Sequence, residues 1–183
     1  MSSPNSRRGA ASYLESSLAN HSLAHLLISS IAAAVGTPLY VYSSAALEAA
    51  YRDYAEQEVT FQFWVEQLGY EAAVRVSAEP GHSEHQLGTT VDVTNAAVNY
   101  ELEQAFAETA GGRWLAEHAA EFGFVISYVE GREDQTGFSF EPWHIRFVGP
   151  ETAADYEASG LTLNQYLARE WLPGRHLLGL PLE

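Results

Sequence analysis

The stretch that decides the fold of this chain is PGHSEHQLGTTVDV, residues 80–93. Its first half is rich in Gly, Pro, Ser and His, which is typical of a loop, and the alternating, β-branched residues from Thr89 to Val93 predict a strand. Gly88 supplies the turn between the two. Alternation along the strand points Asp92 away from the core that its valine neighbours face, so His85 in the loop and Asp92 can converge at one sheet surface.

A second stretch, TGFSFEPWHIRFVG at residues 136–149, carries Glu141 and His144 among strand-type residues. Pro142 cannot donate to a sheet and marks an edge or a bulge, where irregular geometry can bring the two side chains together. The two stretches supply two histidines and one carboxylate, a set that can hold zinc with its fourth position open. A further glutamate can handle protons on a zinc-bound water. Taken singly, the first pair also reads as a surface loop histidine and a turn-capping aspartate. The second pair also reads as a solvated glutamate and a half-buried histidine beside Trp143.

Composition narrows the classes of function that remain. The 183 residues carry a formal charge of −15, so nucleic acid and anionic membrane surfaces are poor partners. The lack of cysteine excludes disulfides and thiolate zinc sites, and the lack of lysine excludes Schiff-base and pyridoxal phosphate chemistry. The sequence has no run of about 18 apolar residues, the pattern that would predict a transmembrane helix. A signal peptide is not convincing, because His25, Ser29 and Ser30 interrupt the apolar run at 23–35.

The chain reads as one α+β domain at residues 13–171, after a disordered N-terminus at 1–12 and before an apolar C-terminal tail at 172–183. A small antiparallel sheet flanked by helices is expected. Apolar spacing and stop signals predict helices at 13–35, 45–68 with a break near Val59-Thr60, 101–122 with a weak point at Gly111-Gly112, 151–159 and 161–171. Short strands are predicted at 39–42, 89–93, 124–129 and 138–148, with a polar turn at 130–137.

The two stretches resemble the zinc D-alanyl-D-alanine carboxypeptidases of the VanY type, which are LAS metallopeptidases. Those proteins carry S-x-H-x-x-G-x-x-x-D followed by E-x-W-H, and the chain matches both words in order. The resemblance implies an LAS-type fold and a zinc ion bound by His85, Asp92 and His144. It further implies that Glu141 is the general base and that Ser83 orients the loop or the substrate.

An upstream word, AYRDYAEQ at residues 50–57, resembles the family's A-Y-R-S-Y-x-x-Q, with Asp53 in place of serine. The resemblance implies that Arg52 binds the substrate carboxylate or steadies the oxyanion, and that Gln57 assists it. An exposed helix arginine paired with nearby acids is an equally good interpretation.

Residues 36–56 also resemble the opening segment of the diaminopimelate decarboxylases, which use pyridoxal phosphate. That chemistry cannot operate in a chain without lysine. Either the likeness is accidental or the chain joins pieces from two ancestries. In both cases residues 13–57 are an atypical N-terminal part of the peptidase domain.

The sequence as a whole predicts a zinc carboxypeptidase that removes the C-terminal D-alanine from peptidoglycan stem peptides. A catalytically silent module that binds the same peptides is an alternative, as is a related L,D-carboxypeptidase, dipeptidase or endopeptidase. The resemblance implies work at the cell envelope or outside the cell, and the lack of a clear signal peptide leaves the cytoplasm open. Oligomeric state is not indicated.

Overall fold

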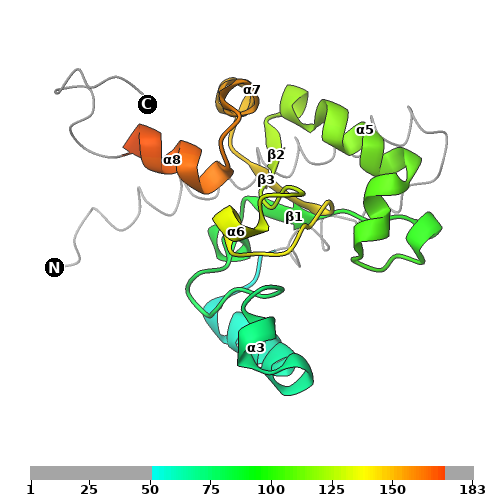
Figure 1. Ribbon diagram of the computed structural model, residues 1–183, viewed down its shortest axis with the longest axis vertical. Helices are drawn as coiled ribbons and strands as arrows, with labels where there is room; N and C mark the ends of the chain where they lie inside the picture. Colours follow the sequence, from blue (N-terminus) through cyan, green and yellow to red (C-terminus); the bar gives the residue numbers. More distant parts are fainter. Residues whose placement is uncertain (1–50, 172–183) are drawn as a thin grey trace, which may run out of the picture.

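A three-stranded antiparallel sheet lies at the centre of the part of the chain that the computed structural model describes, residues 51–171 (Figure 1). The strand order is β1-β3-β2, with β1 at Thr90–Asp92, β2 at Phe124–Ile126 and β3 at His144–Phe147. Helices surround the sheet, so the predicted α+β class with a small antiparallel sheet is confirmed.

The two faces of the sheet pack against different sets of helices, which share only η4. Val91 and Ile145 are cross-strand partners and share one core with residues of η3 (Gln104–Glu108), α5 (Ala110–His118) and η4 (Ala119–Phe122). Val125, on the other face, packs with residues of η4, α7 (Pro150–Ser159) and α8 (Leu163–Trp171). Successive strand residues point to opposite faces of the sheet. Asp92 follows Val91 and His144 precedes Ile145, so both side chains face away from the core that contains Val91 and Ile145.

The N-terminal part of the described chain is helical and leads into the loop before β1. It contains α3 (Tyr54–Leu68), α4 (Tyr70–Ala73) and η1 (Glu84–Leu87). The predicted helix at 45–68 is wrong at its start and in its break. Residues 51–53 are not helical, and α3 begins after a capping box in which Asp53 and Glu56 satisfy each other's backbone N–H groups. Because Asp and Ser cap equally well, Asp53 can replace the family's serine.

The predicted single helix at 101–122 is also wrong, because three shorter elements occupy it. Thr109 separates η3 from α5: its hydroxyl donates to the Phe106 carbonyl at 2.8 Å and accepts from the Gly112 N–H at 3.0 Å. Gly112 packs so closely that a Cβ there would lie 2.0 Å from the Phe106 carbonyl oxygen. The glycine therefore permits a tight junction between η3 and α5.

The remaining predictions hold in outline with shorter strands. The polar turn at 130–137 contains one helical turn, α6 (Glu133–Thr136), and η2 (Ala96–Val98) follows β1. The predicted helix at 13–35, the strand at 39–42 and both terminal segments lie outside the described residues. Among residues 51–171, no helix is long and apolar enough to cross a membrane.

Candidate functional site

Three candidate metal ligands converge at the end of the sheet. Asp92 and His144 are direct partners in the β1–β3 register, which places side chains on one face about 5 Å apart at Cβ. His85 comes from η1, and Gly88, with a φ of 69°, turns the chain from η1 into β1. The ligand atoms of all three residues lie within 4.8 Å of one another. The structure thus brings together the set that the sequence predicted.

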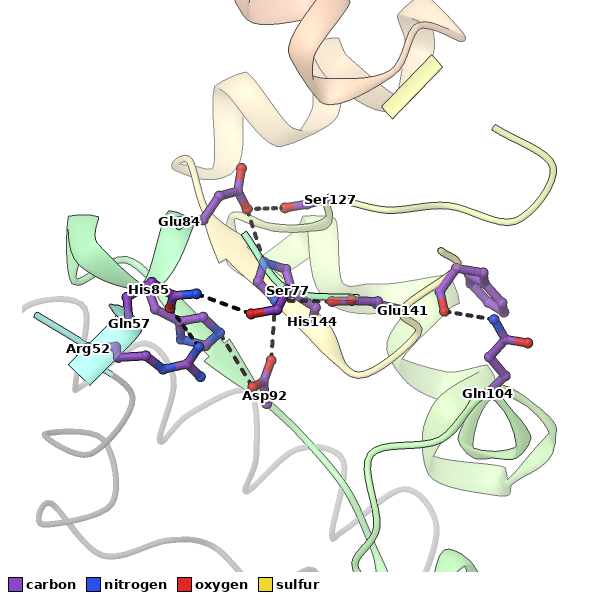
Figure 2. A network of polar contacts seen from close by, with 11 residues as sticks. Arg52, Gln57, Ser77, Glu84, His85, Asp92, Gln104, Ser127, Glu141 and His144 are labelled. Atoms are coloured by element: carbon purple, nitrogen blue, oxygen red, sulfur yellow. Dashed lines mark hydrogen bonds and ion pairs between the residues drawn. The ribbon is translucent and has the colours of Figure 1, made fainter. Parts of the chain in front are cut away.

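The two oxygens of Asp92 face the two histidines separately. Oδ2 lies 3.4 Å from His85 Nε2, and Oδ1 lies 3.3 Å from His144 Nδ1 (Figure 2). Oδ1 is buried, and within the described chain it receives no hydrogen bond. A buried carboxylate oxygen that lacks a donor is costly, and a cation would satisfy it. Two histidine nitrogens and a carboxylate oxygen are ligands that zinc accepts in an open tetrahedral site, so the residues fit this metal.

The electrostatics of the cluster favour a positive charge beside Asp92. Burial alone would raise the pKa of the Asp92 carboxyl, but His144 and His85 hold that pKa well below its usual range. Burial would likewise lower the pKa of His144, yet the Asp92 and Glu84 carboxylates raise it to about 10. Without a metal the site keeps a proton on His144, and a divalent cation can replace that positive charge.

Glu141 lies next to these residues, in the turn that leads into β3. Its backbone N–H donates to the Tyr128 carbonyl at 3.0 Å, and its carbonyl accepts from His144 N–H at 3.1 Å, which fixes the irregular geometry expected at Pro142. Its Oε2 lies 3.6 Å from His144 Nδ1. Burial, together with the charges of Asp92 and Glu84, outweighs the opposing effect of His144 and raises the pKa of Glu141 to about 7. A carboxyl with such a pKa is suited to moving protons near neutral pH.

The metal candidates and Glu141 open onto a cavity of about 410 Å³ that Arg52, Gln57 and Ser83 also line. Arg52 is held there by two contacts: its backbone N–H donates to the His85 carbonyl at 3.4 Å, and its Nη1 donates to Gln57 Oε1 at 2.8 Å. Gln57 has no exposed surface, and its amide nitrogen donates to the Ala78 carbonyl at 2.6 Å. Gln57 therefore anchors Arg52 at the edge of the cavity. Arg52 precedes α3 and is only partly exposed, so the interpretation of it as an exposed helix arginine paired with nearby acids is wrong.

Three further residues belong to the site that sequence reasoning did not assign. Glu84 lies 3.1 Å from His144 Nε2 and accepts a hydrogen bond from Ser127 Oγ at 2.6 Å (Figure 2). It also accepts a hydrogen bond from Arg146 Nη1 at 2.7 Å. Arg146 could have been found, because it follows His144 by two residues and so shares its face of the strand. Glu84 and Ser127 carry no such signal, since their meeting depends on the packing of η1 against the end of β2.

The comparisons with known proteins agree with this geometry. A family model described as "VanY: D-alanyl-D-alanine carboxypeptidase" matches residues 24–150. That range includes the whole stretch at 36–56, whose likeness to diaminopimelate decarboxylases stays an interpretation of the sequence.

Two curated relatives each match about two thirds of the chain. YodJ of Bacillus subtilis (strain 168) is 39% identical over 119 residues, which cover 65% of this chain and 44% of YodJ. A D-alanyl-D-alanine carboxypeptidase of Enterococcus faecium is 32% identical over 121 residues, which cover 66% of this chain and 35% of that protein. The chain therefore spans less than half the length of either relative.

Solved structures share the fold. The L,D-carboxypeptidase DacB from Streptococcus pneumoniae is 37% identical, with a TM-score of 0.65 and coverage of 80% of this chain and 73% of DacB. A mutant of the vancomycin resistance D,D-pentapeptidase VanY in complex with Zn(II) is 34% identical, with a TM-score of 0.55 and coverage of 64% of this chain and 67% of that one. These likenesses confirm the predicted LAS-type fold. With the family match over most of its length, the chain belongs to the VanY family of D-alanyl-D-alanine carboxypeptidases.

Proposed function

We propose that the chain is a zinc-dependent carboxypeptidase that removes the C-terminal D-alanine from peptidoglycan stem peptides. The observation that carries the proposal is the convergence of His85, Asp92 and His144 beside Glu141 at the wall of one cavity. The VanY structure with Zn(II) supports zinc as the metal for this ligand set. Peptidoglycan of the cell envelope is accordingly the proposed partner.

Zinc, when bound by His85, Asp92 and His144, supplies Lewis acidity that polarises the peptide carbonyl and lowers the pKa of water. Glu141 accepts the proton of the attacking water at its carboxylate and returns it to the leaving amine of D-alanine. This transfer is typically worth about 10²–10⁴ in rate. The burial that raises the pKa of Glu141 also limits the access of bulk water to its carboxyl group.

Arg52 is the residue proposed to bind the terminal carboxylate of the peptide. Its guanidinium lines the cavity while its Nη1 is fixed by Gln57, so the fork of remaining donors is already oriented before substrate binds. A local cation is needed because the chain as a whole carries a charge of −15, which repels an anionic peptide end. Ser83 is buried at the same wall and is proposed to support the loop or the substrate.

The test is release of D-alanine from a synthetic stem pentapeptide that ends in D-Ala-D-Ala. Purified protein should release it with zinc, stop in excess chelator, and recover when zinc is restored. Glu141→Ala should bind zinc and release no D-alanine. Stoichiometric zinc and peptide binding without turnover in the unmodified protein would instead support the silent binding module.

A second candidate, an L,D-carboxypeptidase, is favoured by one observation: the likeness to DacB is higher in both identity and TM-score than the likeness to VanY. The same residues would then cleave the bond between an L-residue and the terminal D-alanine. A tetrapeptide that ends in L-Lys-D-Ala, assayed beside the pentapeptide, separates the two specificities. Preference for the tetrapeptide would replace the D,D-proposal.

A further inference from the structure

The buried carboxylate of Glu84 has no part in the mechanism above, yet it lies directly against His144. It comes from η1, immediately before His85 in the sequence, and only 10% of its side chain is exposed. Its Oε1 accepts a hydrogen bond from Arg146 Nη1 at 2.7 Å. Its Oε2 accepts one from Ser127 Oγ at 2.6 Å and lies 3.1 Å from His144 Nε2 (Figure 2).

These contacts fix both the charge and the direction of the Glu84 carboxylate. Arg146 pairs with one oxygen and the Ser127 hydroxyl with the other, so the group is an ionised acceptor with no proton of its own to donate. The nitrogen of His144 that faces it, Nε2, must therefore carry the hydrogen. In a neutral imidazole the lone pair then sits on Nδ1, which lies 3.3 Å from Asp92 Oδ1.

We propose that Glu84 is a positioning residue that holds the His144 ring with Nε2 protonated, so that Nδ1 is the nitrogen presented to the metal. The inference rests on the proposed zinc site and deepens it. Carboxylate partners of this kind fix the tautomer and ring orientation of metal-binding histidines and make them stronger ligands. Ser127 and Arg146 act one step further out, by holding Glu84 in place.

Arg146 has a second consequence for the metal. A buried, unpaired carboxylate this close to two histidines would compete with Asp92 for a cation. Because Arg146 lies 2.7 Å from Glu84 and is itself only 20% exposed, the charge of Glu84 is already compensated. Glu84 is thereby kept as a hydrogen-bond acceptor for His144, and Asp92 remains the carboxylate with an oxygen that needs a cation.

The competing explanation is that Glu84 only balances Arg146 and stabilises the fold. Glu84→Ala alone cannot separate the two explanations, because it leaves the Arg146 charge buried and unpaired and so destabilises the protein in either case. The double variant Glu84→Ala, Arg146→Met removes both charges. It should unfold in excess chelator at nearly the temperature of the unmodified protein, since replacing a buried ion pair with apolar groups is often neutral.

Zinc affinity, measured by competition with a chromophoric chelator, is the deciding quantity. It should fall about 10–100-fold in the double variant although stability has recovered, as is typical when such a histidine partner is lost. Glu58→Gln, which removes an exposed charge on α3, is the matched control and should bind zinc as the unmodified protein does. In ¹⁵N-histidine NMR spectra of the zinc-loaded protein, His144 should carry its proton on Nε2 only, and the double variant should lose this fixed pattern.

The outcomes distinguish this inference from the proposed function. If the unmodified protein fails to bind zinc, both the zinc site and the role of Glu84 are overturned. If the unmodified protein binds zinc and the stable double variant binds it equally well, only the positioning role is overturned. A proton on Nδ1 of His144 in the zinc-loaded protein would also overturn it.

Discussion

Glu141→Gln should slow turnover strongly and, without zinc, make the protein more stable at alkaline pH. The substitution preserves the size of the side chain and removes a carboxylate that lies among Asp92 and Glu84. In the native protein, burial and these two neighbours raise the pKa of Glu141 from 4.5 to about 7. An acid whose pKa is higher in the folded state than in the unfolded state binds more protons when folded, so ionising it opposes folding.

The size of the effect follows from the two pKa values. A change from 4.5 to about 7 corresponds to about 3 kcal/mol, since one pH unit is worth about 1.4 kcal/mol. The side chain is only 11% exposed, so solvent screening removes little of this. Above pH 7 the native protein bears the full cost, between pH 7 and 4.5 the cost fades, and below pH 4.5 it is gone. For a chain of this length, about 3 kcal/mol raises the melting temperature by roughly 6–12 °C.

The assay is thermal unfolding in excess chelator at pH 8 and at pH 4, with Glu58→Gln as the control for loss of an exposed charge. Glu141→Gln should melt higher than the unmodified protein at pH 8 and at the same temperature at pH 4. Release of D-alanine by the zinc-loaded variant should fall by about 10²–10⁴. A melting temperature at pH 8 that is unchanged or lower would refute the claim that Glu141 is held ionised against its surroundings.

Three other perturbations test the cavity and the metal. Arg52→Lys keeps the positive charge but loses the forked donors of the guanidinium, so it should lower kcat/KM about 10–100-fold, mostly by raising KM, and leave zinc affinity unchanged. An unchanged KM would exclude a contact between Arg52 and the substrate carboxylate. Gln57→Met should lower the free energy of unfolding, measured with denaturant, by about 1–3 kcal/mol, because the Ala78 carbonyl loses its buried donor. It should also raise KM, because Arg52 loses its hydrogen-bond partner. Unchanged stability would contradict the anchoring role of Gln57. Zinc binding should release about one proton at pH 8, from His144, and nearly two protons at pH 6, because Glu141 then also releases one. Calorimetry in buffers of different ionisation enthalpy measures the number of protons released. Release of no protons at either pH would contradict this charge balance.

The metal candidates could be predicted from the sequence because local rules placed each of them. Strand alternation predicted that Asp92 lies on the other face of the strand from its valine neighbours. Pro142 indicated the irregular turn that brings Glu141 and His144 together. The cross-strand register that joins Asp92 to His144 could not be read from either stretch, since strands 52 residues apart pair only through the fold. The two stretches therefore indicate the candidate ligands but not the strand pairing that brings them together.

The helix boundaries were harder to predict for a physical reason that differs at each place. Thr60 has low helix propensity, but its hydroxyl bonds back to the Glu56 carbonyl at 2.9 Å and α3 continues through it. At Thr109 the same kind of side chain does the opposite, because its hydroxyl caps α5 and ends the preceding 3₁₀ turn. Sequence spacing does not distinguish these two uses of a threonine hydroxyl, and packing around Gly112 decides the second.

The division of charge around His144 explains why nearby carboxylates can have different tasks. Burial alone would raise the pKa of Glu84, but the hydrogen bond and charge of His144, followed by the charge of Arg146 at 2.7 Å and the Ser127 hydroxyl, lower it to about 2. Glu141 receives only weaker compensation from His144 and Arg52, so its proton remains exchangeable near neutral pH. In the proposed mechanism, the ion pair with Arg146 therefore helps to keep Glu84 as an acceptor for His144, while Asp92 binds the metal and Glu141 moves protons.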